Sequence, residues 1–162
     1  MRIRNVQLSD LADLDAISEE TEFLGSEYRY IHWALARYFG ETSFAVEDSN
    51  RVVGFIFCVP TARADTLFVW ELAVSKRYDG KLRGRDLFER AIQFAIDRGF
   101  ERVEFSIDPS NRITINTIGR ALSRRGLVMV KIGSSAPHHM APRVELAESQ
   151  DLYVIALDRR HV

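Results

Sequence analysis

One stretch decides the fold: Thr66-Leu67-Phe68-Val69-Trp70-Glu71-Leu72-Ala73-Val74, which runs into a basic segment at residues 75–86. Its nearly continuous apolar character predicts a strand that is buried on both faces. Over residues 86–98 the apolar side chains fall at helical spacing, and residues 102–107 alternate strictly between apolar and polar. A strand, a glycine-containing loop, an amphipathic helix and a second strand form one βαβ unit, whose crossover we expect to be right-handed.

Further strands and helices are predicted on both sides of this unit. The other strand-like segments are residues 2–8, 42–47, 52–59, 127–132 and 152–157, and Asp48-Ser49-Asn50 is a turn by composition. One helix begins at Ser9 or Asp10, whose side-chain oxygen would cap its first amides, and two more cover residues 26–39 and 111–125. The order β-α-α-β-β-β-α-β-α-β-β predicts an α/β fold, a mixed sheet of about seven strands with four helices on both faces.

Composition sets the broad class of protein. The chain has 162 residues, 46% of them hydrophobic, so we expect a single domain over residues 1–162 with a core of its own. A net charge of −1 argues against nucleic-acid and membrane-surface partners. No stretch approaches the ~20 apolar residues of a membrane span, and the first residues lack a secretory pattern. We therefore expect a cytoplasmic protein.

The basic segment at residues 75–86 joins the buried strand to a helix N-terminus, where free N–H groups and the helix dipole favour an anion. Gly80 and Gly84 let the backbone approach a ligand closely. Several cations lie in or near the segment: Lys76, Arg77, Lys81, Arg83, Arg85 and Arg90. Two interpretations stand beside each other here, a cradle for a pyrophosphate and a solvated basic loop with ordinary turn glycines.

Together these residues resemble the GNAT superfamily of acyl-CoA-dependent N-acetyltransferases over almost the whole chain. The element order matches, and so do Leu72-Ala73-Val74-Ser75, the glycine-containing loop, residues 85–91 and Asp108-Pro109-Ser110-Asn111. Residues 64–74 and 151–155 are similar to the corresponding segments of the diaminobutyrate acetyltransferases of ectoine synthesis.

The resemblance implies a sheet that splays between the fourth and fifth strands, with acetyl-CoA in the cleft and no metal. The pantetheine arm would pair with the fourth strand, the pyrophosphate would lie on the loop, and an asparagine would lie near the pantetheine. The implied coenzyme-binding residues are Leu72, Ala73, Val74, Gly80, Lys81, Arg83, Gly84, Arg85 and Asn111. The sequence departs from the family pattern at Asp79, Leu82 and Ile118.

The reaction implied is transfer of an acetyl group to the primary amine of a small molecule, such as an amino acid like diaminobutyrate, by direct attack. Such an amine is protonated at neutral pH, so a base is needed. Glu71 is the candidate, because it is the one ionisable group in an apolar strand. The alternative for Glu71 is a structural ion pair with an arginine of the next strand.

Other residues are candidates for the acceptor site, and each has a structural alternative. Trp70 is expected on one face with Phe68 and Leu72, opposite Glu71, as a pocket wall or as core. The candidate substrate-binding residues are Glu22, Tyr28, Trp70 and Glu148. Cys58 is expected to be a buried, inert thiol, and the adjacent His138 and His139 do not have metal-ligand spacing.

Two other functions remain open at this stage. Asp79, Leu82 and Ile118 would suit a non-catalytic module that binds acyl-CoA or another small ligand on the same scaffold. The aromatic side chains of residues 28–38 would suit a contact surface in a homodimer.

Overall fold

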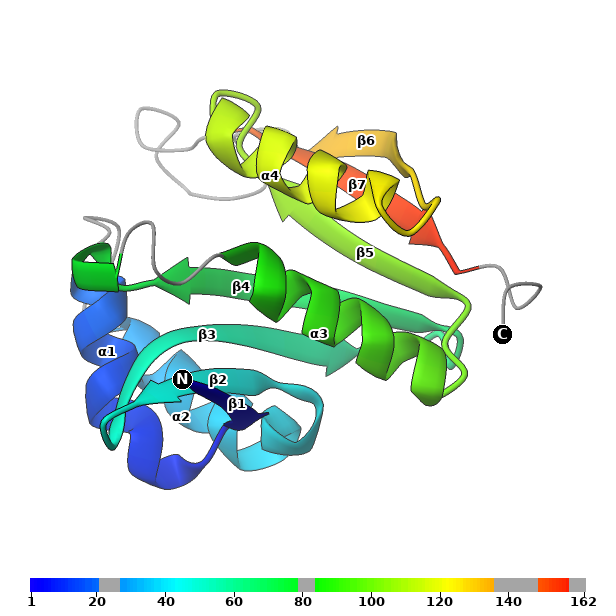
Figure 1. The fold of residues 1–162 in the computed structure, drawn as a ribbon. Coiled ribbons are helices and arrows are strands. Elements are labelled where there is room, and N and C mark those ends of the chain that lie inside the picture. The colour runs from blue at the N-terminus through cyan, green and yellow to red at the C-terminus, as the bar shows by residue number, and fades with distance from the viewer. Residues whose placement is uncertain (21–26, 79–83, 136–148, 158–162) are drawn as a thin grey trace.

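The computed structural model describes residues 1–20, 27–78, 84–135 and 149–157, with the backbone alone at residues 27 and 28 (Figure 1). Its strands are β1 (Arg2–Asn5), β2 (Phe44–Asp48), β3 (Arg51–Pro60), β4 (Thr66–Val74), β5 (Arg102–Ile107), β6 (Met129–Ser135) and β7 (Gln150–Ala156). Its α-helices are α1 (Leu11–Glu19), α2 (Glu27–Phe39), α3 (Gly84–Asp97) and α4 (Arg112–Ser123). Short 3₁₀ turns are η1 (Leu8–Asp10), η2 (Gly40–Thr42) and η3 (Lys76–Tyr78). The predicted element order is confirmed.

All seven strands belong to one mixed sheet in the order β1-β2-β3-β4-β5-β7-β6. The first four are antiparallel neighbours, and β2, β3 and β4 form a meander, whose β2–β3 turn places Ser49 and Asn50 at φ 51° and 62°. This is the left-handed conformation of a tight hairpin, at the turn predicted from composition. None of the described helices combines the length and apolar character needed to cross a bilayer. A single domain over residues 1–162 stays a prediction.

Two hydrophobic cores show that the helices cover both faces of the sheet, as predicted (Figure 1). One core packs α3 and α4 on the sheet, and its fully buried side chains include Phe44, Ile56, Leu67, Leu87, Phe88, Ile92, Leu122 and Ile155. The other packs α1 and α2 on the opposite face, and its buried side chains include Leu14, Ile17, Leu35, Phe55 and Phe57.

The expected divergence of the fourth and fifth strands is confirmed. β4 and β5 are parallel, and their pairing covers only residues 66–69 of β4 with residues 102–105 of β5. Figure 1 shows the two strands side by side near the α3–β5 connection and apart at their carboxyl ends. Over residues 70–74, β4 therefore has no strand partner on its β5 side among the described residues.

A bulge interrupts β4 at the point of divergence. On β3, Phe57 pairs with Glu71 and the next residue, Cys58, pairs with Val69. Trp70 is therefore the extra residue, with no partner opposite it. An extra residue exchanges the two faces of the strand beyond it, because side chains alternate with a period of two.

The bulge corrects the expectation that Trp70 shares a face with Phe68 and Leu72. Phe68 and Trp70 do touch, with ring centroids 6.4 Å apart. Leu72, however, packs against the core under α3, while Ala73 belongs to the core under α1 and α2. Strict alternation along the whole strand is wrong for this reason, and Glu71 consequently lies on the face covered by α1 and α2.

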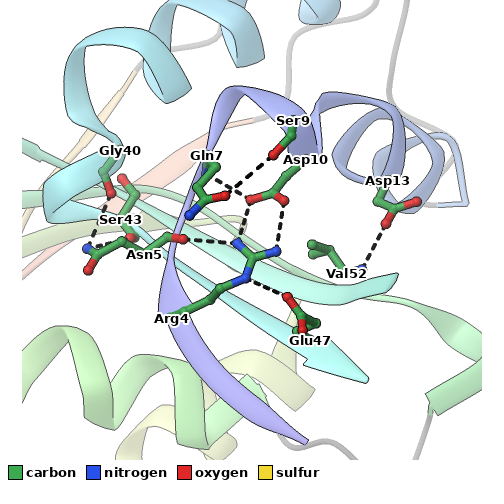
Figure 2. Close-up of polar contacts among 10 residues, drawn as sticks. All are labelled: Arg4, Asn5, Gln7, Ser9, Asp10, Asp13, Gly40, Ser43, Glu47 and Val52. Atoms are coloured by element: carbon green, nitrogen blue, oxygen red, sulfur yellow. Dashed lines mark hydrogen bonds and ion pairs between the residues drawn. The ribbon is translucent and has the colours of Figure 1, made fainter. Parts of the chain in front are cut away.

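A network of charged side chains attaches β1 to the rest of the sheet (Figure 2). The guanidinium of Arg4 donates to both carboxylate oxygens of Asp10, at 2.8 and 2.9 Å, and to Glu47 at 2.6 Å. Asp10 also accepts the backbone N–H of Gln7 at 2.8 Å. The Asp10 carboxylate therefore binds Arg4 and accepts the backbone N–H of Gln7 at the start of η1. It does not cap the amides of α1, as the sequence suggested.

Candidate functional site

A cleft of about 660 Å³ opens where β4 and β5 part. One wall is the free edge of β4, and the other is formed by the end of β5 and the first turns of α4. The lining residues are Val69, Trp70, Glu71, Leu72, Phe88, Phe105, Ser106, Ile107, Asp108, Ser110, Asn111, Thr114, Ile118 and Gln150. The cleft therefore combines aromatic and aliphatic surface with a few polar groups, which is typical of a ligand site.

Glu71 lies on the β4 wall, with its side chain 20% exposed, and it is part of a partly buried polar cluster. Its Oε1 accepts a hydrogen bond from the hydroxyl of Ser18 at 3.2 Å. Its Oε2 lies 3.3 Å from Nε2 of His32, whose Nδ1 lies 2.8 Å from Oδ1 of Asp15. Arg29 lies 3.9 Å from Asp15 at the surface end. Among the described residues, Glu71 thus contacts a serine and a histidine, rather than the arginine of the next strand that was the alternative.

His32 links two carboxylates from the interior of the protein. Its side chain is 0% exposed and its ring lies 5.7 Å from the rings of both Phe55 and Phe57. Burial by itself lowers the pKa of His32, but the hydrogen bonds and charges of Glu71 and Asp15 outweigh it and raise the pKa above the usual 6.5. The charged form of His32 is therefore more stable, relative to the neutral form, than that of a free histidine.

The sequence did not point to this cluster. His32 occupies the position of an apolar residue on α2, in line with Leu35 and Ala36 at spacings of three and four. That spacing could have placed it on the buried face of the helix. Its partners could not be found in the same way, because Asp15 lies 17 residues and Glu71 lies 39 residues away along the chain.

The residues expected to face the pantetheine arm lie along the free edge of β4. Leu72 lines the cleft, and Val74 packs beside it against the α3 core. Ala73 points to the opposite core and is 8% exposed, so only its backbone could serve a ligand in the cleft. Because residues 70–74 have no β5 partner, this edge can take part in a strand-like backbone pairing.

The N-terminus of α3 lies close to the same edge. A Cβ on Gly84 would stand 3.2 Å from Cδ2 of Leu72, so glycine permits the close approach of helix and strand. Arg85 is paired with Asp86 at 3.1 Å and with Glu89 at 3.4 Å. The helix start is therefore placed near the cleft wall, with its one described arginine of the first turn already held by carboxylates.

Asn111 and Ile118 lie on the opposite wall, on or just before α4. The side-chain oxygen of Asn111 accepts the backbone N–H of Thr114 at 3.1 Å, so this residue caps the helix as well as lining the cleft. Ile118 is 4% exposed and contributes apolar surface. Trp70 is 50% exposed at the mouth of the divergence.

Several of the expected site residues lie outside the described residues: Glu22, Asp79, Gly80, Lys81, Leu82, Arg83, His138, His139 and Glu148. Tyr28 belongs to α2, but only its backbone is described. Cys58 is 0% exposed, and burial raises the pKa of its thiol far above the usual range, so it is not poised as a nucleophile. No group of three or more histidine, cysteine or carboxylate side chains in the described ranges is placed to hold a metal ion.

The chain is similar in sequence to known acetyltransferases. Two relatives called L-2,4-diaminobutyric acid acetyltransferase are each 30% identical to the chain, over 80% of it in Nocardia farcinica and 72% in Shouchella clausii. The chain spans about two thirds of the length of these relatives, 67% and 65%.

A solved structure shares the fold. It is the diaminobutyrate acetyltransferase EctA from Paenibacillus lautus, in complex with L-2,4-diaminobutyric acid and coenzyme A. It superposes with a TM-score of 0.83 at 22% identity, and the match covers 96% of this chain and 93% of the other. Residues 8–122 match the acetyltransferase (GNAT) family as a whole, and the chain therefore belongs to that family.

Proposed function

We propose that this chain transfers an acetyl group from acetyl-CoA to the primary amine of a small molecule. The observation that carries the proposal is the parting of β4 and β5 after Val69, which opens a cleft with Glu71 on its wall. Family membership supports the reaction, and the named relatives are all acetyltransferases. Nothing favours the non-catalytic binding module over the enzyme.

Acetyl-CoA would lie across the cleft with its pantetheine arm along the free β4 edge. The amides of Leu72, Ala73 and Val74 are the proposed partners of that arm, with Asn111 facing it from α4. The pyrophosphate would lie at the start of α3, where unpaired N–H groups and the helix dipole favour an anion. The other proposed contacts are Gly80, Lys81, Arg83, Gly84 and Arg85.

The proposed chemistry is direct attack. The carboxylate of Glu71 takes a proton from the ammonium group of the acceptor, directly or through one water. The neutral nitrogen attacks the thioester carbonyl, and backbone N–H groups near Leu72 or Ala73 stabilise the oxyanion. The C–N bond forms in this attack, and the C–S bond breaks when the tetrahedral intermediate collapses. The nitrogen releases its second proton to solvent water. A thiol with a pKa near 8.5 can leave as thiolate and take a proton from water, so no acid is required at Ile118.

Diaminobutyrate is the first acceptor to test, because the relatives carry that substrate in their names. The residues proposed to contact the acceptor are Glu22, Tyr28, Trp70 and Glu148. A homodimer through the exposed aromatic side chains of α2, Tyr30, Trp33 and Tyr38, stays a prediction, as does a cytoplasmic location.

The test is release of free thiol from acetyl-CoA by the purified protein with L-2,4-diaminobutyrate, and then with a panel of other primary amines. We expect turnover with at least one amine and a rise in melting temperature with acetyl-CoA alone. A coenzyme-dependent rise without turnover on any amine would favour the non-catalytic module. If millimolar acetyl-CoA gives neither turnover nor a rise in melting temperature, the proposal is overturned.

A further inference from the structure

The buried histidine behind the cleft has a role that goes beyond packing. His32 comes from α2 and lies between Asp15 of α1 and Glu71 of β4, so three elements meet at one imidazole ring. Among the described residues, the charged groups that face the ring are Asp15 from α1 and Glu71 from β4, while β3 presents the rings of Phe55 and Phe57. Beyond Asp15, Arg29 of α2 is paired with Glu19 at 3.1 Å.

Counting protons settles which form of the ring fits this place. A neutral imidazole has one N–H and one lone pair, whereas each carboxylate can only accept. With either neutral tautomer, one nitrogen lone pair would therefore face a carboxylate oxygen inside the protein. The contacts at 2.8 Å and 3.3 Å are both satisfied when both ring nitrogens carry a proton. The raised pKa of His32 agrees with this count.

We propose that His32 is a positioning residue for acetyl transfer: held as an imidazolium between Asp15 and Glu71, it fixes the carboxylate of Glu71 at the wall of the cleft. This inference rests on the proposed function, in which Glu71 is the base. His32 itself touches neither the acceptor nor the coenzyme in this proposal.

The arrangement leaves Glu71 able to work. A carboxylate has about four lone-pair sites, and the hydrogen bonds from Ser18 and His32 occupy two of them, one on each oxygen. No described residue occupies the remaining sites, which can accept a proton from the cleft side. Without the imidazolium, Glu71 would lose its charged partner and its fixed orientation, and a base that is misplaced by 1 Å can lose about 10²-fold in rate.

The ring also makes the position of Glu71 depend on pH. When His32 loses its second proton, the N–H that remains on Nδ1 keeps the shorter contact to Asp15, and the contact from Nε2 to Glu71 is lost. The rate should therefore fall on the alkaline side of the pH profile, at the pKa of His32. A residue with a purely structural role would not place such a limb in the profile.

A matched pair of variants tests the positioning role. In His32→Gln the amide nitrogen stands about as far from Cα as Nε2 does, so it can still donate to Glu71, but it cannot titrate. In His32→Leu both hydrogen bonds are lost while the volume is roughly kept. We expect His32→Gln to stay within about tenfold of the wild type at pH 7 without the alkaline limb, and His32→Leu to lose about 10²-fold in kcat, with an unchanged melting-temperature shift on adding acetyl-CoA.

Asp15→Asn tests the proton count. The asparagine amide can donate to Nδ1, so a neutral ring then has a partner on both sides. We expect the pKa of His32 to fall and the alkaline limb to vanish, while the hydrogen bond to Glu71 is kept.

Nitrogen NMR of the imidazole rings reads the charge of His32 without any substrate. The chain has four histidines, and His32 is the resonance missing from the His32→Gln spectrum. We expect His32 to carry two protons at pH 7 in the wild type and one in Asp15→Asn. A neutral His32 at pH 7 in the wild type, or His32→Leu with wild-type kcat, would overturn the inference and leave the proposed function standing. A wild type that transfers no acetyl group would overturn both.

Discussion

Two clusters of buried charge join the N-terminal part of the chain to the sheet, and they differ in the base at their centre. At the sheet edge, Arg4 holds Asp10 and Glu47 with contacts of 2.6 to 2.9 Å (Figure 2). Behind the cleft, His32 holds Asp15 and Glu71 with contacts of 2.8 and 3.3 Å. Each cluster thus places one basic side chain between a carboxylate near or on α1 and a carboxylate on a strand.

The difference lies in what each base can do near neutral pH. The hydrogen bond to Asp10 raises the pKa of Arg4 further above its already high usual value, so the guanidinium keeps its charge at any pH at which the protein folds. An imidazole can lose its charge within a few units of neutrality. The Arg4 cluster therefore keeps the same charge and only stabilises the fold. The His32 cluster, beside the cleft, can also change its charge with pH.

The largest effect expected is on activity, from Glu71→Gln. Glutamine keeps the size and hydrogen bonding of the side chain but cannot take a proton, so acetyl transfer should fall by about 10² to 10⁴-fold. Glu47→Gln is the matched control in the edge cluster and should leave the rate near that of the wild type. Steady-state thiol release measures both variants. If both variants lose the same factor in rate, the two clusters do not differ in their role in acetyl transfer.

Removing the base of the edge cluster should cost stability instead. Arg4→Met leaves Asp10, 5% exposed, without its charged partner, and we expect unfolding to become easier by about 3 kcal/mol. Arg51→Met is the control, because Arg51 pairs with Asp13 from a side chain that is 72% exposed, and it should change little. Urea unfolding compares the two, and a loss of the same size in both would contradict the buried role of Arg4.

A smaller effect should appear in the pH dependence of stability. The pKa of His32 is raised in the folded protein, so its contribution is complete below about 6.5, the unfolded value, and is lost as pH rises through the folded pKa. The stability of the wild type relative to His32→Gln should thus decline on the alkaline side of pH 6.5. Arg4→Met should add no such dependence. Thermal unfolding measures the difference in melting temperature between wild type and His32→Gln at each pH. A difference that is the same at every pH would contradict the expected decline.

The smallest effect concerns Asn111, which has a structural and a proposed binding role in one side chain. Asn111→Ala removes the cap of α4 and should cost about 1 kcal/mol, whereas Asn111→Ser keeps a capping oxygen and should cost less. If Asn111 also contacts the pantetheine arm, both variants should bind acetyl-CoA more weakly. Calorimetric titration separates the roles, and wild-type affinity in Asn111→Ser would remove the binding role.

The sequence predicted the order of the elements because hydrophobic period and turn residues are local properties. Residues 102–107 were predicted as a strand with the bounds that β5 has, and Ser49 and Asn50 mark the turn that was expected. The bulge at Trp70 was missed, since the period of β4 gives no indication of an extra residue until its register with β3 is known. The shared face expected for Phe68, Trp70 and Leu72 was wrong for that single reason.

The same limit applies to the site. Glu71 stood out because a carboxylate in an apolar strand needs an explanation. His32 did not, because a histidine on the apolar face of a helix is ordinary until its neighbours are known. The contacts of His32 with Asp15 and Glu71 join α1, α2 and β4, and only the folded chain brings those segments together.

The short parallel pairing of β4 and β5 has a mechanical consequence. Four residue pairs join the β1–β4 half of the sheet to the β5–β7 half, supported by ring contacts such as Phe88 against Phe105 at 5.4 Å. Because this pairing lies at one end of the two strands, any molecule that spans the open end adds a second attachment far from it. Filling the cleft should therefore stiffen the two halves against each other and slow hydrogen exchange in β6, a strand with no residue among those that line the cleft.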